Sequence, residues 1–183
     1  PVMAKTAASV VRYRPEEVVA LYDSTESGKT SGELLGVGEG VPIIASLDDA
    51  DAANTLMIGI APSGGQIPAP WRWIILEAIS RGMDVVSGLH DFLADDVEFA
   101  AAASRHGVEL VDVRKNDEHD VARREGIRDD CLRIQTVGND CCVGKMVASI
   151  ELASGLQRQG VDAEFVATGQ TGILIAGSGC PID

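Results

Sequence analysis

Short apolar runs alternate with stretches of helical periodicity along the first part of the chain. The runs predict buried strands at residues 18–22, 42–45, 56–60, 84–86 and 108–113. They are continuously apolar rather than alternating, which is typical of strands buried on both faces of a parallel sheet. Between two of them, Trp71, Ile75 and Ala78 share one helical face. We therefore predict an α/β fold, a parallel sheet with helices on both faces.

Local start and stop signals place the helices between these strands. A helix is predicted over residues 4–13, and Pro15 ends it. Asp95, with Glu98 three residues later, predicts the cap of another helix, which Gly107 closes.

Residues 24–40 are rich in Gly, Ser, Thr and Glu, a composition that predicts a loop. Within this loop, Ser27-Gly28-Lys29-Thr30 imitates the end of a phosphate-binding motif. No glycine stands where the motif requires one upstream, so we interpret the match as chance.

A change of composition divides the chain into two domains. Residues 116–130 are charged and poor in apolar positions, which predicts a linker between domains at residues 1–115 and 131–183. The second domain is predicted to hold a strand at 132–137, a helix at 146–159 and a strand at 163–167. Two strands and one helix cannot close an α/β domain, so we expect this domain to be incomplete and the chain truncated.

The turn between that predicted strand and helix carries the most specific chemical signal. It reads Gly138-Asn139-Asp140-Cys141-Cys142-Val143-Gly144-Lys145 and leads into Met146. Backbone N–H groups of such a turn can surround an anion, and the helix N-terminus adds partial positive charge. A lysine in the first turn of a helix opposes the helix dipole, so Lys145 favours a bound phosphate. We predict that residues 138–146 bind a phosphate or nucleotide.

Two departures from the usual phosphate-binding loop affect what it can bind. Five residues separate its glycines instead of four, a spacing similar to the Gly-Thr-Asp-x-x-Val-Gly-Lys loop of dethiobiotin synthetase. Met146 replaces the hydroxyl residue that usually binds magnesium, and Ser149 is a poor substitute one helical turn later. Whether the loop binds magnesium therefore stays open. The plainer alternative is a strand-to-helix turn with an exposed lysine.

The charge of the chain excludes some partners. Its net charge is −13, and it contains only four lysines. Such a surface repels nucleic acid and acidic membranes, and it suggests a protein from a high-salt cytoplasm. An ordinary acidic bacterial protein is the alternative. The chain shows no apolar run long enough to cross a membrane and no signal peptide, so we expect it in the cytoplasm. The four cysteines lack zinc-site spacing and are interpreted as reduced thiols.

Five segments together resemble one known family. They are Ala4-Lys5-Thr6-Ala7, Ile58-Gly59-Ile60-Ala61-Pro62, Ser87-Gly88-Leu89-His90, the loop at 138–145, and Ala167-Thr168-Gly169-Gln170-Thr171-Gly172. In this order they resemble the DgcN family, long known only as a domain of unknown function. The resemblance implies a Rossmann-like N-terminal domain followed by the start of a P-loop NTPase-like domain of dethiobiotin synthetase type. Some members are D-glutamate N-acyltransferases that use acyl-coenzyme A.

Acyl transfer to an amine needs a base and a group that polarises the thioester carbonyl. His90 follows a predicted strand and is the candidate base. Thr168, Gly169, Gln170, Thr171 and Gly172 follow another and are candidates for binding the substrate. The plainer alternatives are a surface or helix-capping histidine and a tight turn.

Three functions remain open from the sequence. The first is N-acylation of a D-glutamate-like amino acid by acyl-CoA, whose phosphates the loop could hold. The second is ATP- and magnesium-dependent ligase or kinase-like chemistry of the dethiobiotin synthetase type. The third is a nucleotide-binding regulatory protein without catalysis. In each case we expect a small-molecule ligand and a homo-oligomer.

Overall fold

The computed structural model describes residues 4–116, 123, 125–140 and 143–182. Its elements follow the chain in the order α1 (Lys5–Tyr13), β1 (Leu21–Tyr22), α2 (Ser31–Leu35), β2 (Ile43–Ile44), β3 (Thr55–Met57), α3 (Arg72–Ser80), β4 (Asp84–Ser87), α4 (Val97–His106), β5 (Leu110–Asp112), α5 (Lys145–Arg158) and α6 (Gln170–Ala176). Short 3₁₀ turns join several of them.

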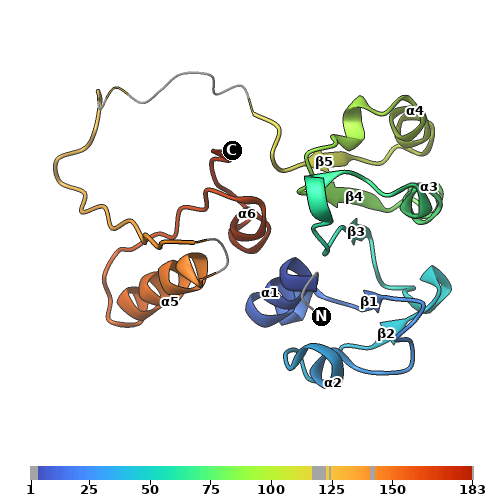
Figure 1. Cartoon of the computed structure of the whole chain (residues 1–183), viewed down its shortest axis with the longest axis horizontal. Helices are drawn as coiled ribbons and strands as arrows, with labels where there is room; N and C mark the ends of the chain where they lie inside the picture. The colour runs from blue at the N-terminus through green and yellow to red at the C-terminus, as the bar shows by residue number, and fades with distance from the viewer. Residues whose placement is uncertain (1–3, 117–122, 124, 141–142, 183) are drawn as a thin grey trace.

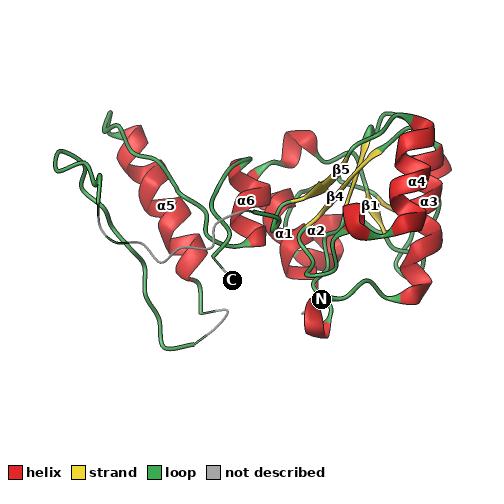
Figure 2. Cartoon of the chain, turned by 90° about the horizontal axis from the view of Figure 1, so that it is seen from above, coloured by secondary structure: helices red, strands yellow, loops and turns green. Residues whose placement is uncertain are grey.

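All five described strands run parallel, in the order β1-β2 in one sheet and β3-β4-β5 in the other. Figure 2 shows α3 and α4 on one side of the strands and α1 and α2 on the other. The predicted α/β architecture is therefore confirmed. Its core lies between the larger sheet and α3 and α4, where Ile75, Ile79, Val85, Leu93 and Phe99 are almost completely buried. A core of Ile, Val and Leu suits a chain with only 4% aromatic residues.

An apolar cavity of about 980 Å³ lies between the two sheets, and both contribute to its wall. Leu21 and Tyr22 of β1 line one side, and Leu56 and Met57 of β3 line another. Helices α1 and α3 also contribute. The edges of β1 and β3 thus face one cavity instead of pairing in a continuous sheet.

Helix α6 fixes the second half of the molecule to the first. It packs against α1, where the hydroxyl oxygens of Thr6 and Thr171 lie 2.9 Å apart. The Arg14 guanidinium donates to the Leu174 carbonyl at 3.2 Å. Figure 1 shows α6 between α5 and the first half, and α5 on the outer side.

The two strands predicted in the second half are not formed. Residues 132–137 form neither helix nor strand and are exposed apart from half-buried Thr136, with Leu132 at 86% and Val137 at 82% of their full accessibility. Of residues 163–167, Ala167 makes an isolated bridge to Gly179. An apolar run becomes a strand only when another edge satisfies its backbone groups, and the described residues of this half provide no such edge.

The loop predicted at residues 24–40 also needs correction, because it contains α2. Thr30 caps this helix: its hydroxyl accepts from the Glu33 N–H, while the Glu33 carboxylate accepts from the Thr30 N–H. This is a capping box, whose Thr-x-x-Glu spacing was visible in the sequence. Lys29 pairs with Glu26 at 2.5 Å, so this lysine serves a local surface contact.

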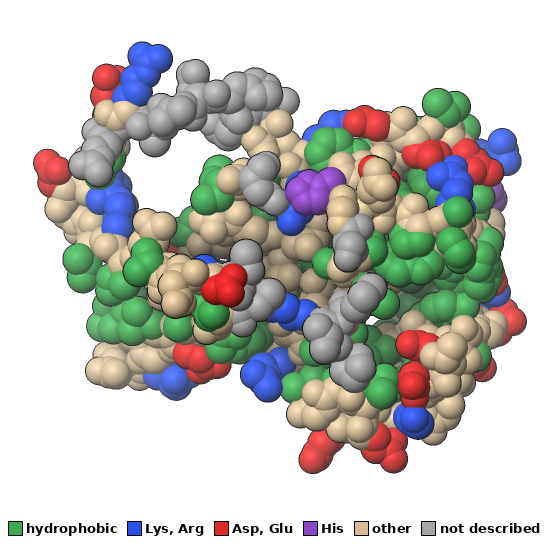
Figure 3. All heavy atoms as spheres, in the orientation of Figure 1, with side chains coloured by type: hydrophobic (Ala, Val, Ile, Leu, Met, Phe, Trp, Pro, Cys, Tyr) green, Lys and Arg blue, Asp and Glu red, His purple; other side chains and the backbone are tan. Residues whose placement is uncertain are grey.

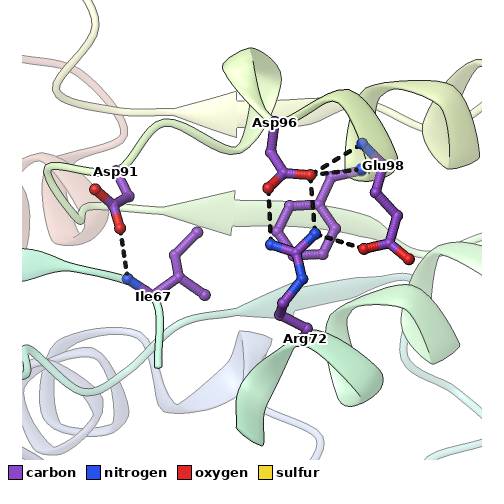
Figure 4. A network of polar contacts seen from close by, with 6 residues as sticks. Ile67, Arg72, Asp91, Asp96 and Glu98 are labelled. Atoms are coloured by element: carbon purple, nitrogen blue, oxygen red, sulfur yellow. Dashed lines mark hydrogen bonds and ion pairs between the residues drawn. The ribbon is translucent and has the colours of Figure 1, made fainter. Parts of the chain in front are cut away.

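The sequence predicted Asp95 as the cap of α4, but the residue that caps this helix is Asp96. The Asp96 carboxylate accepts from the N–H groups of Glu98 at 3.0 Å and Phe99 at 3.1 Å. It also accepts two hydrogen bonds from Arg72, at 2.7 and 3.0 Å, and the guanidinium lies 4.3 Å from the centre of the Phe99 ring (Figure 4). Asp96 thereby ties the start of α3 to the start of α4, while Asp95 pairs with Lys115 at the surface.

Hydrogen bonds from Arg72 lower the pKa of Asp96 to about 2, which links this contact to acid stability. Because the unfolded carboxyl titrates near 3.9, the stabilisation is complete above about pH 5 and is lost as the pH falls towards 2. We expect Asp96→Asn, which keeps a capping side chain but loses the charge, to cost about 1 kcal/mol at neutral pH, reduced by partial exposure. Asp96→Ala should cost about 2 kcal/mol because the cap is lost too.

The matched control is Asp95→Asn, which removes the same charge from the neighbouring residue and should change stability by less than about 0.5 kcal/mol. Urea unfolding at neutral pH and near pH 3 measures all three variants. Equal stability of the two Asn variants at neutral pH would contradict the role given to Asp96.

Candidate functional site

The predicted phosphate-binding loop leads directly into α5, as the sequence indicated. Gly144 is the N-cap of the helix and has a left-handed backbone with φ of 98°. Apart from its chain neighbours, no described residue has an atom within 4 Å of the position of a Cβ on Gly144, so its left-handed backbone conformation requires glycine here. No side chain caps α5 among the described residues. Its first-turn N–H groups and the positive end of its dipole therefore face the loop.

The loop closes on itself around Gly138. A Cβ on Gly138 would lie 2.8 Å from Cγ2 of Val143 and 3.3 Å from Cδ of Lys145. The Lys145 ammonium donates a hydrogen bond to the Asp140 carbonyl. The lysine thus arches back over the loop, and its charge lies beside the turn that an anion would enter. The other predicted loop residues Cys141 and Cys142 lie outside the described residues.

Two hydroxyl groups fix the chain that enters the loop to the helix that leaves it. The hydroxyl oxygens of Thr136 and Ser149 are 2.7 Å apart, and the Lys145 carbonyl lies within hydrogen-bond distance of both, at 3.0 and 3.2 Å. Thr136 was not recognised in the sequence, because a hydroxyl residue among the mixed residues of 132–137 gives no distinct signal. Met146, the last predicted loop residue, lies in the first turn of α5.

His90 follows β4, but no described hydrogen bond or ion pair joins it to the phosphate-binding loop. Its backbone N–H donates to the Gly65 carbonyl at 2.8 Å. Its exposed ring lies against Gly65, where an added Cβ would come within 2.2 Å of the ring. The side chain is therefore positioned at the carboxyl end of the sheet and open to solvent.

The predicted substrate-binding residues are not the loop that the sequence indicated. Thr168 precedes α6, Gly169 is its N-cap, and Gln170, Thr171 and Gly172 form its first turn. The Thr171 hydroxyl contacts Thr6 of the first half, and Gly172 is buried.

Gln170 brings this region to the end of β4. Its side chain lies against Gly88, where a Cβ would come within 2.6 Å of the Cβ of Gln170. Because Gly88 lies two residues before His90, the structure places the two predicted groups on neighbouring segments. Arg114 holds the segment at Gly88: its Nε donates to the Gly88 carbonyl at 2.7 Å, and burial lowers the pKa of its guanidinium. Sequence reasoning missed Arg114, which has no local signal.

The surface is mixed rather than dominated by one patch. Figure 3 shows acidic side chains spread over this face and apolar side chains gathered over α5. Among the described residues, no three His, Cys, Asp or Glu side chains come together as a metal site. None of the helices in the described part is long and apolar enough to span a bilayer.

Family models match both halves of the chain. A Rossmann-like domain, the N-terminal DUF1611 domain of unknown function, matches residues 24–116. A P-loop domain, the C-terminal DUF1611 domain, matches residues 119–183. The chain belongs to the DUF1611 family.

Two relatives and a solved structure are similar to this chain. The chain is 37% identical over 183 residues to a D-glutamate N-acetyltransferase of Tritonibacter scottomollicae, covering 98% of this chain and 52% of the relative. It is 44% identical over 131 residues to an enzyme of the same name from a Pseudoalteromonas species, covering 72% of this chain and 39% of the relative. A DUF1611 family protein from Anabaena variabilis superposes with a TM-score of 0.87 at 37% identity, covering 97% of this chain and 52% of that one. This DUF1611 chain thus spans about half the length of such relatives or less.

The contact between Gly88 and Gln170 can be tested by adding one methyl group. Gly88→Ala should push α6 away from β4 and lower stability by about 1–3 kcal/mol, because Cβ of Gln170 cannot rotate out of the way. Gly169→Ala is the control, since among the described residues beyond its chain neighbours none has an atom within 4 Å of its Cβ position. Thermal unfolding and limited proteolysis of the purified protein measure the difference. Equal melting temperatures for the two variants would refute the close contact.

Proposed function

We propose that this DUF1611 protein transfers an acyl group from acyl-coenzyme A to the amine of an acidic D-amino acid such as D-glutamate. The observation that carries the proposal is the loop at 138–145, where Lys145 arches over a glycine turn at an uncapped helix start. The names of two relatives support acyl transfer as the chemistry. The proposal concerns the whole protein. The match to the Tritonibacter relative covers 98% of this chain but only about half of the relative, 52% of its length.

The loop supplies what a phosphate of coenzyme A requires. Coenzyme A carries a 3′-phosphate and a pyrophosphate, and backbone N–H groups at a helix start bind either group well. The Lys145 ammonium adds a full positive charge to this local field. In a chain with net charge −13, such a local arrangement is needed to attract an anionic ligand.

His90 is the proposed general base. The amine nitrogen of the amino acid attacks the thioester carbonyl, the C–N bond forms, and the C–S bond breaks. His90 removes the proton that the amine loses, and the departing thiolate of coenzyme A takes up a proton. Exposure of His90 at the end of β4 allows a substrate to reach it.

The substrate carboxylates are assigned to the residues at the start of α6. Because the Thr171 hydroxyl is bonded to Thr6, the Gln170 amide and the exposed Thr168 hydroxyl are the groups proposed to hold them. Gln170 lies against Gly88 on the segment that leads to His90, so it is close to the proposed base. The reaction is assigned to the cytoplasm, where acyl-CoA is available, and to a homo-oligomer.

Binding of coenzyme A should depend on Lys145. Lys145→Ala removes the ammonium group of the loop and should weaken binding of acetyl-CoA by about tenfold or more. Lys29→Ala is the control, because it removes the same charge from the other lysine in a Gly-Lys pair, one that is bonded to Glu26. Isothermal titration of the full-length protein, in high salt to limit self-repulsion, gives both affinities.

The same titrations separate the alternative functions. Binding of ATP only, and only with magnesium, would replace the proposal by ligase or kinase-like chemistry. Binding of a nucleotide without turnover would indicate a regulatory protein. Unchanged affinity in Lys145→Ala would remove the loop from the site.

The role of His90 predicts a separate kinetic effect. His90→Gln should lower the rate of thiol release from acetyl-CoA in the presence of D-glutamate by roughly 10²–10⁴-fold, the range for loss of a general base. Its affinity for acetyl-CoA should stay unchanged, because the ring lies against Gly65 and no hydrogen bond or ion pair among the described residues joins it to the loop at 138–145. The comparison with L-glutamate reports the handedness of the substrate. Full activity of His90→Gln would exclude it as the base.

A further inference from the structure

Phosphate-binding loops of this class usually work with magnesium, but the donor set at this loop differs from what the ion needs. The residue after the lysine normally supplies a hydroxyl ligand to the metal. Here that residue is Met146, in the first turn of α5. Magnesium requires hard oxygen ligands in near-octahedral geometry, and a thioether does not provide one.

The nearest hydroxyls of α5 and of the segment entering the loop are held by other groups. The Ser149 hydroxyl lies within hydrogen-bond distance of the carbonyl of Lys145, one helical turn back, at 3.2 Å. Its oxygen also lies 2.7 Å from that of Thr136, which itself lies 3.0 Å from the Lys145 carbonyl. These contacts bind the two hydroxyls to each other and to the helix backbone. The two hydroxyls have one proton each, so turning Ser149 towards the loop would break its hydrogen bond to the Lys145 carbonyl or the one it shares with Thr136.

Carboxylates do not replace the missing hydroxyl. Asp140 contributes one acidic side chain in the loop itself. Among the residues that the structure describes, no group of three acidic, histidine or cysteine side chains could complete a metal site. Magnesium commonly keeps several waters beside one or two carboxylates and the phosphates of its ligand, so Asp140 alone does not replace the hydroxyl that usually fixes the ion at the loop. The residues present therefore do not fit the usual magnesium of a phosphate-binding loop.

We propose that this loop binds its phosphate group directly, through backbone N–H groups and Lys145, without a divalent cation. The ligand class that suits such a site is a phosphate or diphosphate ester like those of coenzyme A, rather than a magnesium–nucleoside triphosphate complex. The Lys145 ammonium, already directed onto the loop at the Asp140 carbonyl, takes the place of the metal as the counter-charge. This inference rests on the proposed function only in assigning the loop as the ligand site.

Titration of the full-length protein with coenzyme A tests the inference, in excess EDTA and then in millimolar magnesium. The affinity should agree within about twofold in the two buffers, a difference well below 1 kcal/mol. An affinity that rises by about tenfold or more with magnesium would overturn the inference while leaving the proposed function intact. Failure to bind coenzyme A in either buffer would overturn the proposed function instead.

A gain-of-function variant provides the second arm. Met146→Thr restores the hydroxyl and should make binding of ADP respond to magnesium, whereas Met146→Leu, which adds no oxygen ligand, should leave binding of ADP independent of magnesium. Manganese added in place of magnesium gives a direct readout, because its electron paramagnetic resonance signal broadens when the ion is bound. If Met146→Leu responds to the metal as Met146→Thr does, residue 146 does not decide metal use and the inference is wrong.

Discussion

Close packing against glycines at the carboxyl ends of β3 and β4 determines how the two halves of this molecule meet. A Cβ added at Gly59 would lie 2.7 Å from the Cβ of Ala7, and the Ala7 backbone N–H donates to the Gly59 carbonyl at 2.9 Å. At Gly88 the neighbour is Gln170 of the second half. Helices α1 and α6 can therefore approach the strand ends, and their mutual contact follows from it. In a parallel sheet these ends are where ligand sites form, so the same constraint that joins the halves also exposes their polar groups there.

Much of the first half could be predicted because its signals are local. The continuous apolar runs of the strands and the helical periodicity of α1, α3 and α4 lie within windows of about ten residues. The structure confirms these elements. Helix α2 was missed because Gly and Ser concealed a capping box at Thr30. The strand predictions for the second half failed for another reason. Residues 132–137 have the composition of a strand, but a strand forms only by pairing with a second segment, and the composition of one segment does not show whether a partner is present.

The candidate site shows the same division. The loop at 138–145 was predicted because its glycines, its lysine and the following helix are contiguous in sequence. The contacts around the start of α6 and the end of β4 were not predicted, because they join distant residues: Thr6 with Thr171, Gly88 with Gln170 and Arg114 with Gly88. Nothing in the sequence around Gln170 indicates that it begins a helix against the first half, since Gly169 and Gly172 resemble a turn. Buried Gly172 is instead required by packing, with Ala167 3.0 Å from its Cβ position.

Electrostatics gives a reason why the loop must act through short-range groups. A net charge of −13 repels an anionic ligand at long range, and salt removes that repulsion beyond roughly 10 Å at moderate ionic strength. Hydrogen bonds from peptide N–H groups and from Lys145 act at contact distance, where screening is weak. Salt therefore lowers the barrier to approach more than it weakens the contact itself. An acidic protein can in this way retain an anion site, provided that the attraction comes from fixed dipoles and one directed ammonium group rather than from a basic surface.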